Sequence, residues 1–441
     1  MNYRRFFIIL TGKKFILMLT VNFIRENKKL AIEQLAVRNF PADKILDRII
    51  SLDDKRKEIQ NLMDNCLAEI NSLSKEIGRF FKEGKQEEAL IAKEKSTEKK
   101  EESKSLNQKL SDAEKELKEL LIQVPNVPHK SVPKGKEEKD NQIIKSLGLL
   151  PDLGKETLPH WELAKKYDII DFDAGNVLTG SGFPVYKGKG ARLQRALISF
   201  FLDEAIKSGY TEVIPPLMVN EDSAFATGQL PDKDDQMYYI GSDNFYLIPT
   251  AEVPVTNLFR DKIIKSENFP IKMTAYTPCF RREAGSYGKD VRGLNRVHQF
   301  DKVEIVQIQH PDRSYETLDE MVNYVTKLIQ KLEIPFRIVR LCGGDLGFAA
   351  SLTFDFEVYA AAQKKWLEVS SVSNFESYQA ARLKLRFKEG DNKKSRFAHT
   401  LNGSALALPR IVAALLENNQ SEKGISLPKV ISDYAGFNVI N

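Results

Sequence analysis

Apolar residues recur at every third or fourth position in two long stretches in the first part of the chain. In the first stretch, from about residue 42 to residue 81, the apolar positions are Ile59, Leu62, Cys66, Ile70, Leu73, Ile77 and Phe80. In the second stretch they are Leu106, Leu110, Ala113, Leu117, Leu120 and Val124. Each spacing predicts a helix with one apolar stripe, and the second helix should end at Val124-Pro125 because proline cannot continue a helix. With a short turn at Gly84 between them, the two helices should form an antiparallel hairpin, a coiled coil roughly 60 Å long at about 1.5 Å per residue.

Beyond residue 154 the pattern changes, because helical and strand-like runs alternate without the regular βαβ rhythm of a parallel sheet. Residues 191–209 have an amphipathic helical pattern, and residues 210–219 predict a strand broken by Pro215-Pro216. Residues 276–306 predict two antiparallel strands joined by a long basic loop. No P-loop and no GxGxxG follows a strand, so any nucleotide must be bound in another way. We expect an α+β fold, with the helical hairpin followed by a domain built on an antiparallel sheet flanked by helices.

Composition adds little that is specific. The 441 residues are 42% hydrophobic and 29% charged, and the net charge of +5 is a weak hint of a polyanionic partner. The three cysteines, Cys66, Cys279 and Cys342, have no CxxC spacing, and the five histidines are dispersed. We therefore expect a reducing cytoplasm and no structural zinc.

The chain opens with a short basic and apolar segment, MNYRRFFIILTGKKFIL. Lys13 and Lys14 interrupt its apolar run, no small-residue cleavage site follows, and the run is too short to span a bilayer. We interpret residues 1–17 as an N-terminal extension and expect no membrane association. A mitochondrial presequence remains an alternative, since Arg4, Arg5 and the two lysines occur without an acidic residue.

The segment 276–306 carries the candidate chemistry. Positions of one parity are Cys279, Arg281 and Glu283 in the first strand and His298, Phe300 and Glu304 in the second, while Val303 and Ile305 have the other parity. Because side chains alternate across a strand, one face should be apolar and the other polar. Arginine supplies a bidentate fork for phosphate, phenylalanine a flat face for a base, and glutamate a partner for an ammonium or a hydroxyl group. A lone Arg-x-Glu would favour a merely solvated hairpin, so this segment needs support from elsewhere.

That support comes from a resemblance. The run YTPCFRREAGSYGKDVRGLNRVHQFDKVEIV resembles motif 2 of the class II aminoacyl-tRNA synthetases, and its wording is similar to that of the seryl-tRNA synthetases. Residues 191–219 resemble motif 1, which builds the dimer interface in that class, with Pro216 at the position of the family proline. The run FAHTLNGSALALPRIVAALLENN at 397–419 resembles motif 3, with Pro409 in the first turn of a helix and Arg410 at its N-terminus. The resemblance runs from about Met18 to about Ile431.

The resemblance implies an activity and a domain organisation. It implies ATP-dependent activation of L-serine to seryl-adenylate and transfer to the 3′ end of tRNA(Ser), with tRNA(Sec) left open as a second acceptor. It also implies a homodimer. Residues 18–124 would be a tRNA-binding helical hairpin domain, 125–154 a linker rich in Pro, Lys and Glu, and 155–441 the catalytic domain. From charge alone, the lysines near the hairpin tip would be a solvated face, because glutamates are interleaved with them.

The resemblance also assigns site residues. Those implied to be catalytic are Arg281, Glu283 and Arg410. Those implied to bind ATP are Arg281, Arg282, Glu283, Val297, Phe300, Glu368, Val369, Ser370, Ser371 and Arg410. Those implied to bind serine are Thr250, Ala251, Glu252, Arg281, Glu304 and Ser404. Mg²⁺ would bind with ATP near Glu368 and Ser371. A spacing of three puts two side chains on opposite faces of a regular strand, so a bulge or a strand end must intervene if both residues act. The sequence departs from the commonest family wording at Val372 and Ala381, where cysteine and arginine often occur.

Three alternatives remain. A ligase that loads a carrier protein would lack the long hairpin, and a silent RNA-binding or coiled-coil protein would not need the set of charged residues assigned above. A class II enzyme for another amino acid, such as threonine, would need a zinc-ligand set that the sequence does not show.

Overall fold

The computed structural model describes residues 21–154, 157–232, 235–283, 292–390 and 394–441. The predicted extension, residues 1–17, lies outside this part of the chain. The described residues divide into two compact units. One comprises residues 21–36 and 40–125, and the other comprises residues 37–39 and the described residues from 126 to 441. No helix in the described part is long and apolar enough to cross a membrane.

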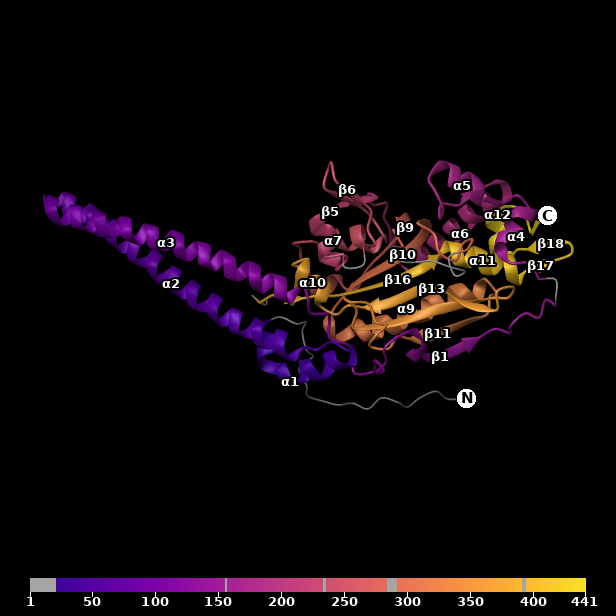
Figure 1. Ribbon diagram of the computed structural model, residues 1–441, viewed down its shortest axis with the longest axis horizontal. Coiled ribbons are helices and arrows are strands. Elements are labelled where there is room, and N and C mark those ends of the chain that lie inside the picture. The colour runs from indigo at the N-terminus through magenta and orange to yellow at the C-terminus, as the bar shows by residue number, and fades with distance from the viewer. Residues whose placement is uncertain (1–20, 155–156, 233–234, 284–291, 391–393) are drawn as a thin grey trace. The chain divides into compact units, whose positions relative to one another are not determined.

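The first unit is helical. Its elements are α1 (Val21–Val37, which ends at the boundary of the unit), α2 (Asp43–Lys82) and α3 (Gln86–Leu121). Figure 1 shows α2 and α3 side by side as a long antiparallel pair. Gly84 lies in the turn between them with a φ of +74°, a left-handed conformation that glycine adopts without strain. The predicted helical hairpin is confirmed.

The seam between α2 and α3 follows the predicted stripe with one error. Ile59 and Cys66 of α2 pack with Leu106 and Ala113 of α3. The prediction for Leu62 was wrong, because this side chain is 50% exposed. Met63 packs in the seam instead. The inward positions 59, 63, 66 and 70 follow a spacing of four, three and four, which keeps them on one side of a helix with 3.6 residues per turn.

The second unit is built on one large sheet. In the described residues eight strands follow the order β1-β11-β12-β13-β16-β10-β9-β4. Their bounds are β1 Gln142–Leu147, β11 Phe336–Arg340, β12 Leu352–Ala360, β13 Lys365–Asn374, β16 His399–Ala407, β10 Gln299–Gln309, β9 Ile271–Phe280 and β4 Thr211–Glu212. All neighbours are antiparallel except β4, which pairs with β9 in parallel. The predicted α+β fold on an antiparallel sheet is confirmed.

Three helices bury one face of this sheet: α6 (Gly188–Lys207), α9 (Ser314–Lys331) and α11 (Leu408–Asn418). Their apolar sides share a core with Val303 and Ile305 of β10, both fully buried, as the parity of that strand predicts. Figure 1 shows α9 along the strands β13 and β11. The opposite parity of β10 is thereby left for polar side chains.

Smaller elements surround the sheet. The helices are α4 His160–Lys166, α5 Phe172–Leu178, α7 Glu221–Thr227, α8 Glu252–Asn257, α10 Tyr378–Arg382 and α12 Lys429–Ala435, with short 3₁₀ turns η1 Glu138–Asp140, η2 Ser266–Asn268 and η4 Pro311–Arg313. The strands are β2 Ile170–Asp171, β3 Val185–Tyr186, β5 Met218–Asn220, β6 Tyr239–Ile240, β7 Phe245–Leu247, β8 Ile263–Lys265, β14 Arg386–Lys388, β15 Arg396–Phe397, β17 Gln420–Ser421, β18 Gly424–Ser426 and β19 Val439–Ile440.

Two predicted segments differ from the structure. Residues 210–219 form two short strands in different sheets, β4 and β5, rather than one broken strand. The intervening Pro215 and Pro216 cannot donate to a sheet ladder, so pairing stops there. The segment read as a linker, 125–154, contains β1, an edge strand of the large sheet. Five of the six residues of β1 are exposed, so its sequence lacks the alternation that marks a half-buried strand.

Candidate active site

The polar face of β9 and β10 brings together the side chains that the strand parity predicts. Phe300 lies opposite Cys279, and Glu304 lies opposite Ala275, so Phe300 and Glu304 project from the same face. The guanidinium of Arg281 lies over the Phe300 ring, 5.1 Å from its centroid. Arg281 also donates from Nε to the carbonyl of Pro249, at 3.3 Å. A cation and an aromatic ring therefore lie next to each other at this end of the β9–β10 strand pair.

The two residues after Arg281 do not continue the strand. β9 ends at Phe280, and Glu283 has a φ of +49°, so the parity rule that grouped Arg281 with Glu283 was wrong for Glu283. The Glu283 carboxylate instead forms an ion pair with Arg296, 2.8 Å from its Nε. Arg282 is half exposed and pairs with Asp235 at 2.9 Å. The Glu283–Arg296 pair joins the two ends of the basic loop, whose residues 284–291 lie outside the described part, and the Arg282–Asp235 pair ties its first end to another segment.

At the other end of the face lies a buried cluster around Glu304. Its Oε2 is 2.6 Å from Nζ of Lys302, and the side chains are 2% and 6% exposed. Lys302 also donates to Oγ1 of Thr250, at 2.8 Å. The hydroxyl groups of Thr250 and Ser404 each lie 3.4 Å from the same Glu304 oxygen. The sequence analysis missed Lys302, although it has the parity of Phe300 and Glu304.

Glu252 lies beside this cluster, at the start of α8. Burial raises the pKa of Glu252 to about 7, with the negative charge of Glu304 as the second cause. Gln379 of α10 donates to the Glu252 carboxylate at 2.6 Å and is itself held by Thr400, which donates to its Oε1 at 2.7 Å. Ala251 is fully buried and presents no polar side chain. Gln379 is a further residue that the sequence analysis missed, since a glutamine on a short helix carries no signal of its own.

A third group lies on β12 and β13. The register between these strands slips by one residue, because Phe356 lies opposite Ser370 while Glu357 lies opposite Glu368. The extra residue, Val369, has no partner, so of the two possibilities, a bulge or a strand end, the structure has the bulge. Ser371 then lies opposite Asp355, two positions from Glu357, so Glu368 and Ser371 reach the same face. Val369 and Ser370 are buried, and Ser370 donates to the carbonyl of Ser404 at 2.6 Å.

Asp355 completes this group and was not predicted. Burial and, next, the charge of Glu368 raise its pKa well above the ordinary value. Its Oδ1 atom is buried without a hydrogen-bond partner. The described residues contain no group of three or more His, Cys, Asp or Glu side chains able to hold a metal alone. Oxygen donors with one unpartnered carboxylate atom fit Mg²⁺ that arrives with a polyphosphate, because this ion uses one or two carboxylates and phosphate oxygens.

Arg410 lies in the N-terminal turn of α11, directly after Pro409, which is in the first turn as predicted. Its Nε donates to the carbonyl of Asn295 at 2.9 Å, and its Nη1 donates to the carbonyl of Glu368 at 2.8 Å. Two backbone acceptors thus fix the direction of a guanidinium that is still partly exposed. Val297, two residues beyond Asn295, is buried.

Of the two departures from the commonest family wording, Val372 is fully buried between sheet and helices, packed against Gly403, and Ala381 lies on α10. Both side chains are apolar, so neither can form a hydrogen bond or an ion pair in the site. The substitutions therefore change packing rather than the set of polar contacts.

Comparison with known proteins agrees with this geometry. Residues 238–419 match the domain family "tRNA synthetase class II core domain (G, H, P, S and T)", and residues 18–128 match "Seryl-tRNA synthetase N-terminal domain". The large antiparallel sheet, with Arg281 over the Phe300 ring, is thus the core of a class II aminoacyl-tRNA synthetase.

Relatives narrow this class. The chain is 47% identical to a serine–tRNA ligase of Salinibacter ruber over 95% of this chain and 98% of that one. The crystal structure of seryl-tRNA synthetase from Pyrococcus horikoshii complexed with ATP is similar at a TM-score of 0.88 and 34% identity, covering 96% and 99% of the two chains. The cytoplasmic serine–tRNA ligase of Naegleria fowleri in complex with AMP has a TM-score of 0.83, 27% identity and the same coverage. The chain belongs to the seryl-tRNA synthetase family, and its activity is that of a serine–tRNA ligase.

Proposed function

We propose that the polar face of the sheet binds ATP at the end near Arg281 and serine at the end near Glu304, and joins them as seryl-adenylate. The observation that carries this proposal is the placement of Glu304 and Phe300 on one strand face, with buried hydroxyl groups around the first and an arginine over the second. An ATP-bound relative of the same fold supports the choice of nucleotide.

The reaction needs no general base, because the serine carboxylate is already the nucleophile. Its oxygen attacks the α-phosphorus in line, the bond to the bridging oxygen of pyrophosphate breaks, and charge grows on the α-phosphate oxygens. Arg281 would hold those oxygens once it leaves the face of Phe300, and adenine would then stack on that ring. Arg410, fixed by the carbonyls of Asn295 and Glu368, would hold the γ-phosphate.

Magnesium bound with ATP would neutralise phosphate charge, held near Glu368 and Ser371. Glu283, paired with Arg296, and Arg282, paired with Asp235, would also contact the nucleotide. Val297, Val369 and Ser370, which are buried, would form the floor of the ATP site. Catalysis in this account is mostly positioning and charge stabilisation.

Serine would be recognised at the Glu304 cluster. Its ammonium group would meet the Glu252 carboxylate and Thr250 beside buried Ala251, while its hydroxyl group would meet Glu304 and Ser404. Alanine would leave these buried polar groups unpaired, which corresponds to roughly 10⁴-fold discrimination. Transfer then follows when the tRNA 3′ hydroxyl attacks the seryl carbonyl and AMP leaves.

The helical unit would bind tRNA(Ser), and tRNA(Sec) is a second acceptor to be tested. Lys93, Lys95, Lys100 and Lys104 of α3 are exposed, which supports contact with a phosphate backbone. We further propose a cytoplasmic homodimer. The exposed apolar side chains of Ile214, Leu217 and Met218, in the segment that resembles motif 1, support an interface there.

Removal of the Arg281 guanidinium tests the phosphate assignment. Arg281→Ala should lower serine-dependent exchange of pyrophosphate into ATP by at least about 100-fold, the loss typical of one transition-state donor. Arg386→Ala is the matched control, because Arg386 also lies over a phenylalanine ring, 5.4 Å from Phe397, but in the separate sheet β15-β14-β8. Equal exchange rates in the two variants would refute the assignment.

A further inference from the structure

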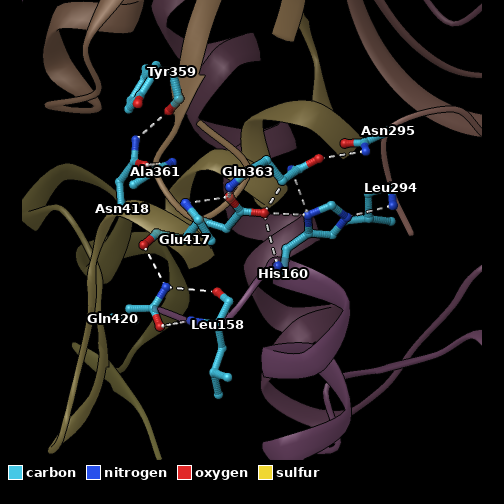
Figure 2. A network of polar contacts seen from close by, with 11 residues as sticks. Leu158, His160, Leu294, Asn295, Tyr359, Ala361, Gln363, Glu417, Asn418 and Gln420 are labelled. Atoms are coloured by element: carbon cyan, nitrogen blue, oxygen red, sulfur yellow. Dashed lines mark hydrogen bonds and ion pairs between the residues drawn. The ribbon is translucent and has the colours of Figure 1, made fainter. Parts of the chain in front are cut away.

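A buried histidine lies at the centre of a polar network outside the groups described above. Figure 2 shows His160, the first residue of α4, between Glu417 and Leu294. Its Nε2 accepts a hydrogen bond from the backbone N–H of Leu294 at 2.8 Å, and its Nδ1 is 2.8 Å from Oε1 of Glu417. Since Nε2 accepts, the ring proton must be on Nδ1, which donates to the carboxylate. Both side chains are 0% exposed, so this orientation of the ring is fixed.

Glu417 anchors the histidine to three elements. Its Oε1 accepts from the backbone N–H of His160 at 3.0 Å and from the side chain of Gln363 at 2.8 Å. Its Oε2 accepts from the backbone N–H groups of Ala362 and Gln363 at 3.1 and 3.2 Å. Glu417 belongs to α11, and the other two residues form the turn between β12 and β13. The His160 ring is thus held from the side opposite Leu294 by a carboxylate whose acceptor capacity is fully used.

The other edge of the ring meets the segment where the basic loop returns to the sheet. A Cβ atom on Gly293 would lie 2.4 Å from Nε2 of His160, so the backbone passes directly against the ring. Gly293 has a φ of +66°, which side-chain-bearing residues rarely adopt. Next to it, the guanidinium of Arg292 lies 4.8 Å from the ring centroid of Trp161, the second residue of α4. Arg292 and Gly293, where the loop returns to the sheet, therefore pack against the N-terminal turn of α4.

The contact extends to Arg410 through one more residue. Asn295, which follows Leu294, donates from its side chain to Oε1 of Gln363 at 2.8 Å. The carbonyl of Asn295 accepts from Nε of Arg410 at 2.9 Å. Glu417 and Arg410 lie on the same helix, α11. The contacts that lead from Glu417 through His160 and Leu294 to Arg410 therefore begin and end on that helix. A shift of the Leu294 backbone would move the acceptor that aims the Arg410 guanidinium.

We propose that His160 is a positioning residue for the activation of serine with ATP. By accepting a hydrogen bond from the Leu294 N–H, it fixes the backbone where the basic loop returns to the sheet, and with it the direction of Arg410. The proposal rests on the proposed function, because that function assigns Arg410 and the basic loop to ATP. Without the acceptor, a buried N–H would be left unpaired, and the backbone would shift to recover a partner. Displacements of about 1 Å at a catalytic group can cost about 100-fold in rate.

Two substitutions separate this role from a merely structural one. In His160→Gln the side-chain amide reaches the place of Nε2, where its oxygen can accept from Leu294. In His160→Asn the amide reaches only the place of Nδ1, where its nitrogen can donate to Glu417. We expect His160→Gln to keep kcat/KM for ATP within a few-fold in pyrophosphate exchange. We expect His160→Asn to lower kcat/KM for ATP by about 10-fold to 100-fold, while the serine KM at saturating ATP stays unchanged.

The opposite order, or equal losses in both variants with equally lowered Tm values, would show that His160 only anchors α4 to α11 and would overturn the proposal. Unchanged exchange in both variants would overturn it too. Should both variants fail to fold, Gln363→Met cuts the Asn295 contact from the partly exposed turn, and an unchanged ATP KM in that variant would be the contradicting result. Exchange by the unsubstituted protein is measured first, because its failure with serine would refute the proposed function and not the role of His160.

Discussion

Replacement of Glu304 by glutamine should affect both stability and serine activation, for separable reasons. Glu304→Gln keeps the shape of the side chain but removes the charge that lies 2.6 Å from Nζ of Lys302. Breaking a buried ion pair by removing one partner costs about 3 to 5 kcal/mol. Glu252 is near enough for the Lys302 charge to act on it, so part of the loss is offset and we expect about 3 kcal/mol. At about 2 °C per kcal/mol, Tm should fall by about 6 °C.

The effect on catalysis should concern serine alone. A hydrogen bond to a charged group contributes about 1.5 to 3 kcal/mol, so kcat/KM for serine in pyrophosphate exchange should fall roughly 10-fold to 100-fold. The ATP KM at saturating serine should stay unchanged, since Phe300 and Arg281 are untouched. Discrimination against alanine should shrink by a similar factor, because the oxygen that accepts from the serine hydroxyl is replaced.

The double variant Lys302→Met/Glu304→Gln separates the two effects. It removes both charges, so Tm should recover toward that of the unsubstituted protein, while serine activation should stay impaired. The single variant Lys302→Met completes the comparison. If the Tm loss of the double variant equals the sum of the losses in the two single variants, the interaction within the buried pair is refuted. A Glu304→Gln protein with normal Tm and normal serine KM would refute the whole placement, and an equal rise in serine and ATP KM would place Glu304 in the nucleotide site.

Three further predictions follow from other parts of the structure. With the pKa of Glu252 at about 7, kcat/KM for serine should rise with pH through that value, because the ionised carboxylate can hold an ammonium group, and Glu252→Gln should flatten this rise. A raised carboxyl pKa makes the folded state lose stability as pH rises from the ordinary pKa to the raised one. The Glu252→Gln protein should therefore have a higher Tm than the unsubstituted protein at about pH 8 but not at about pH 4. Asp355→Asn should raise the Mg²⁺ concentration needed for half-maximal exchange by about 10-fold, and an unchanged magnesium titration would exclude Asp355 from the ion's surroundings. Replacing residues 53–115 of the helical hairpin by a short Gly/Ser turn should leave exchange within a few-fold, raise the tRNA KM and flatten the salt dependence of tRNA binding; undiminished charging of tRNA would contradict the binding role of the hairpin.

The sequence predicts those features that a local pattern contains. The seam of α2 and α3 and the two faces of β10 follow from helix or strand periodicity, which is a property of neighbouring residues. The bulge at Val369 does not, because only the register with β12 locates it. Leu62 shows the limit, since a difference of one position on a long helix decides between seam and solvent. Glu283 shows another, because β9 ends at Phe280 and Glu283 is itself left-handed, so the alternation that the prediction extended does not reach it.

The residues that were missed depend on contacts between distant segments. Lys302 is unremarkable in sequence until Thr250 and Glu304 are found on either side of its ammonium group. His160 lies 257 residues from Glu417 and 134 from Leu294, so no local pattern could assign it a role. Gln379 and Asp355 likewise gain their partners only from burial and strand register.

The most direct test of the account is pyrophosphate exchange measured with each of the twenty amino acids at saturating ATP and magnesium. Serine should support the fastest exchange, and alanine should be less efficient by roughly 10⁴-fold, because it leaves the Glu304 cluster unpaired. Exchange that is equally efficient with alanine or faster with another amino acid would contradict the assignment of Thr250, Glu252, Glu304 and Ser404 to serine.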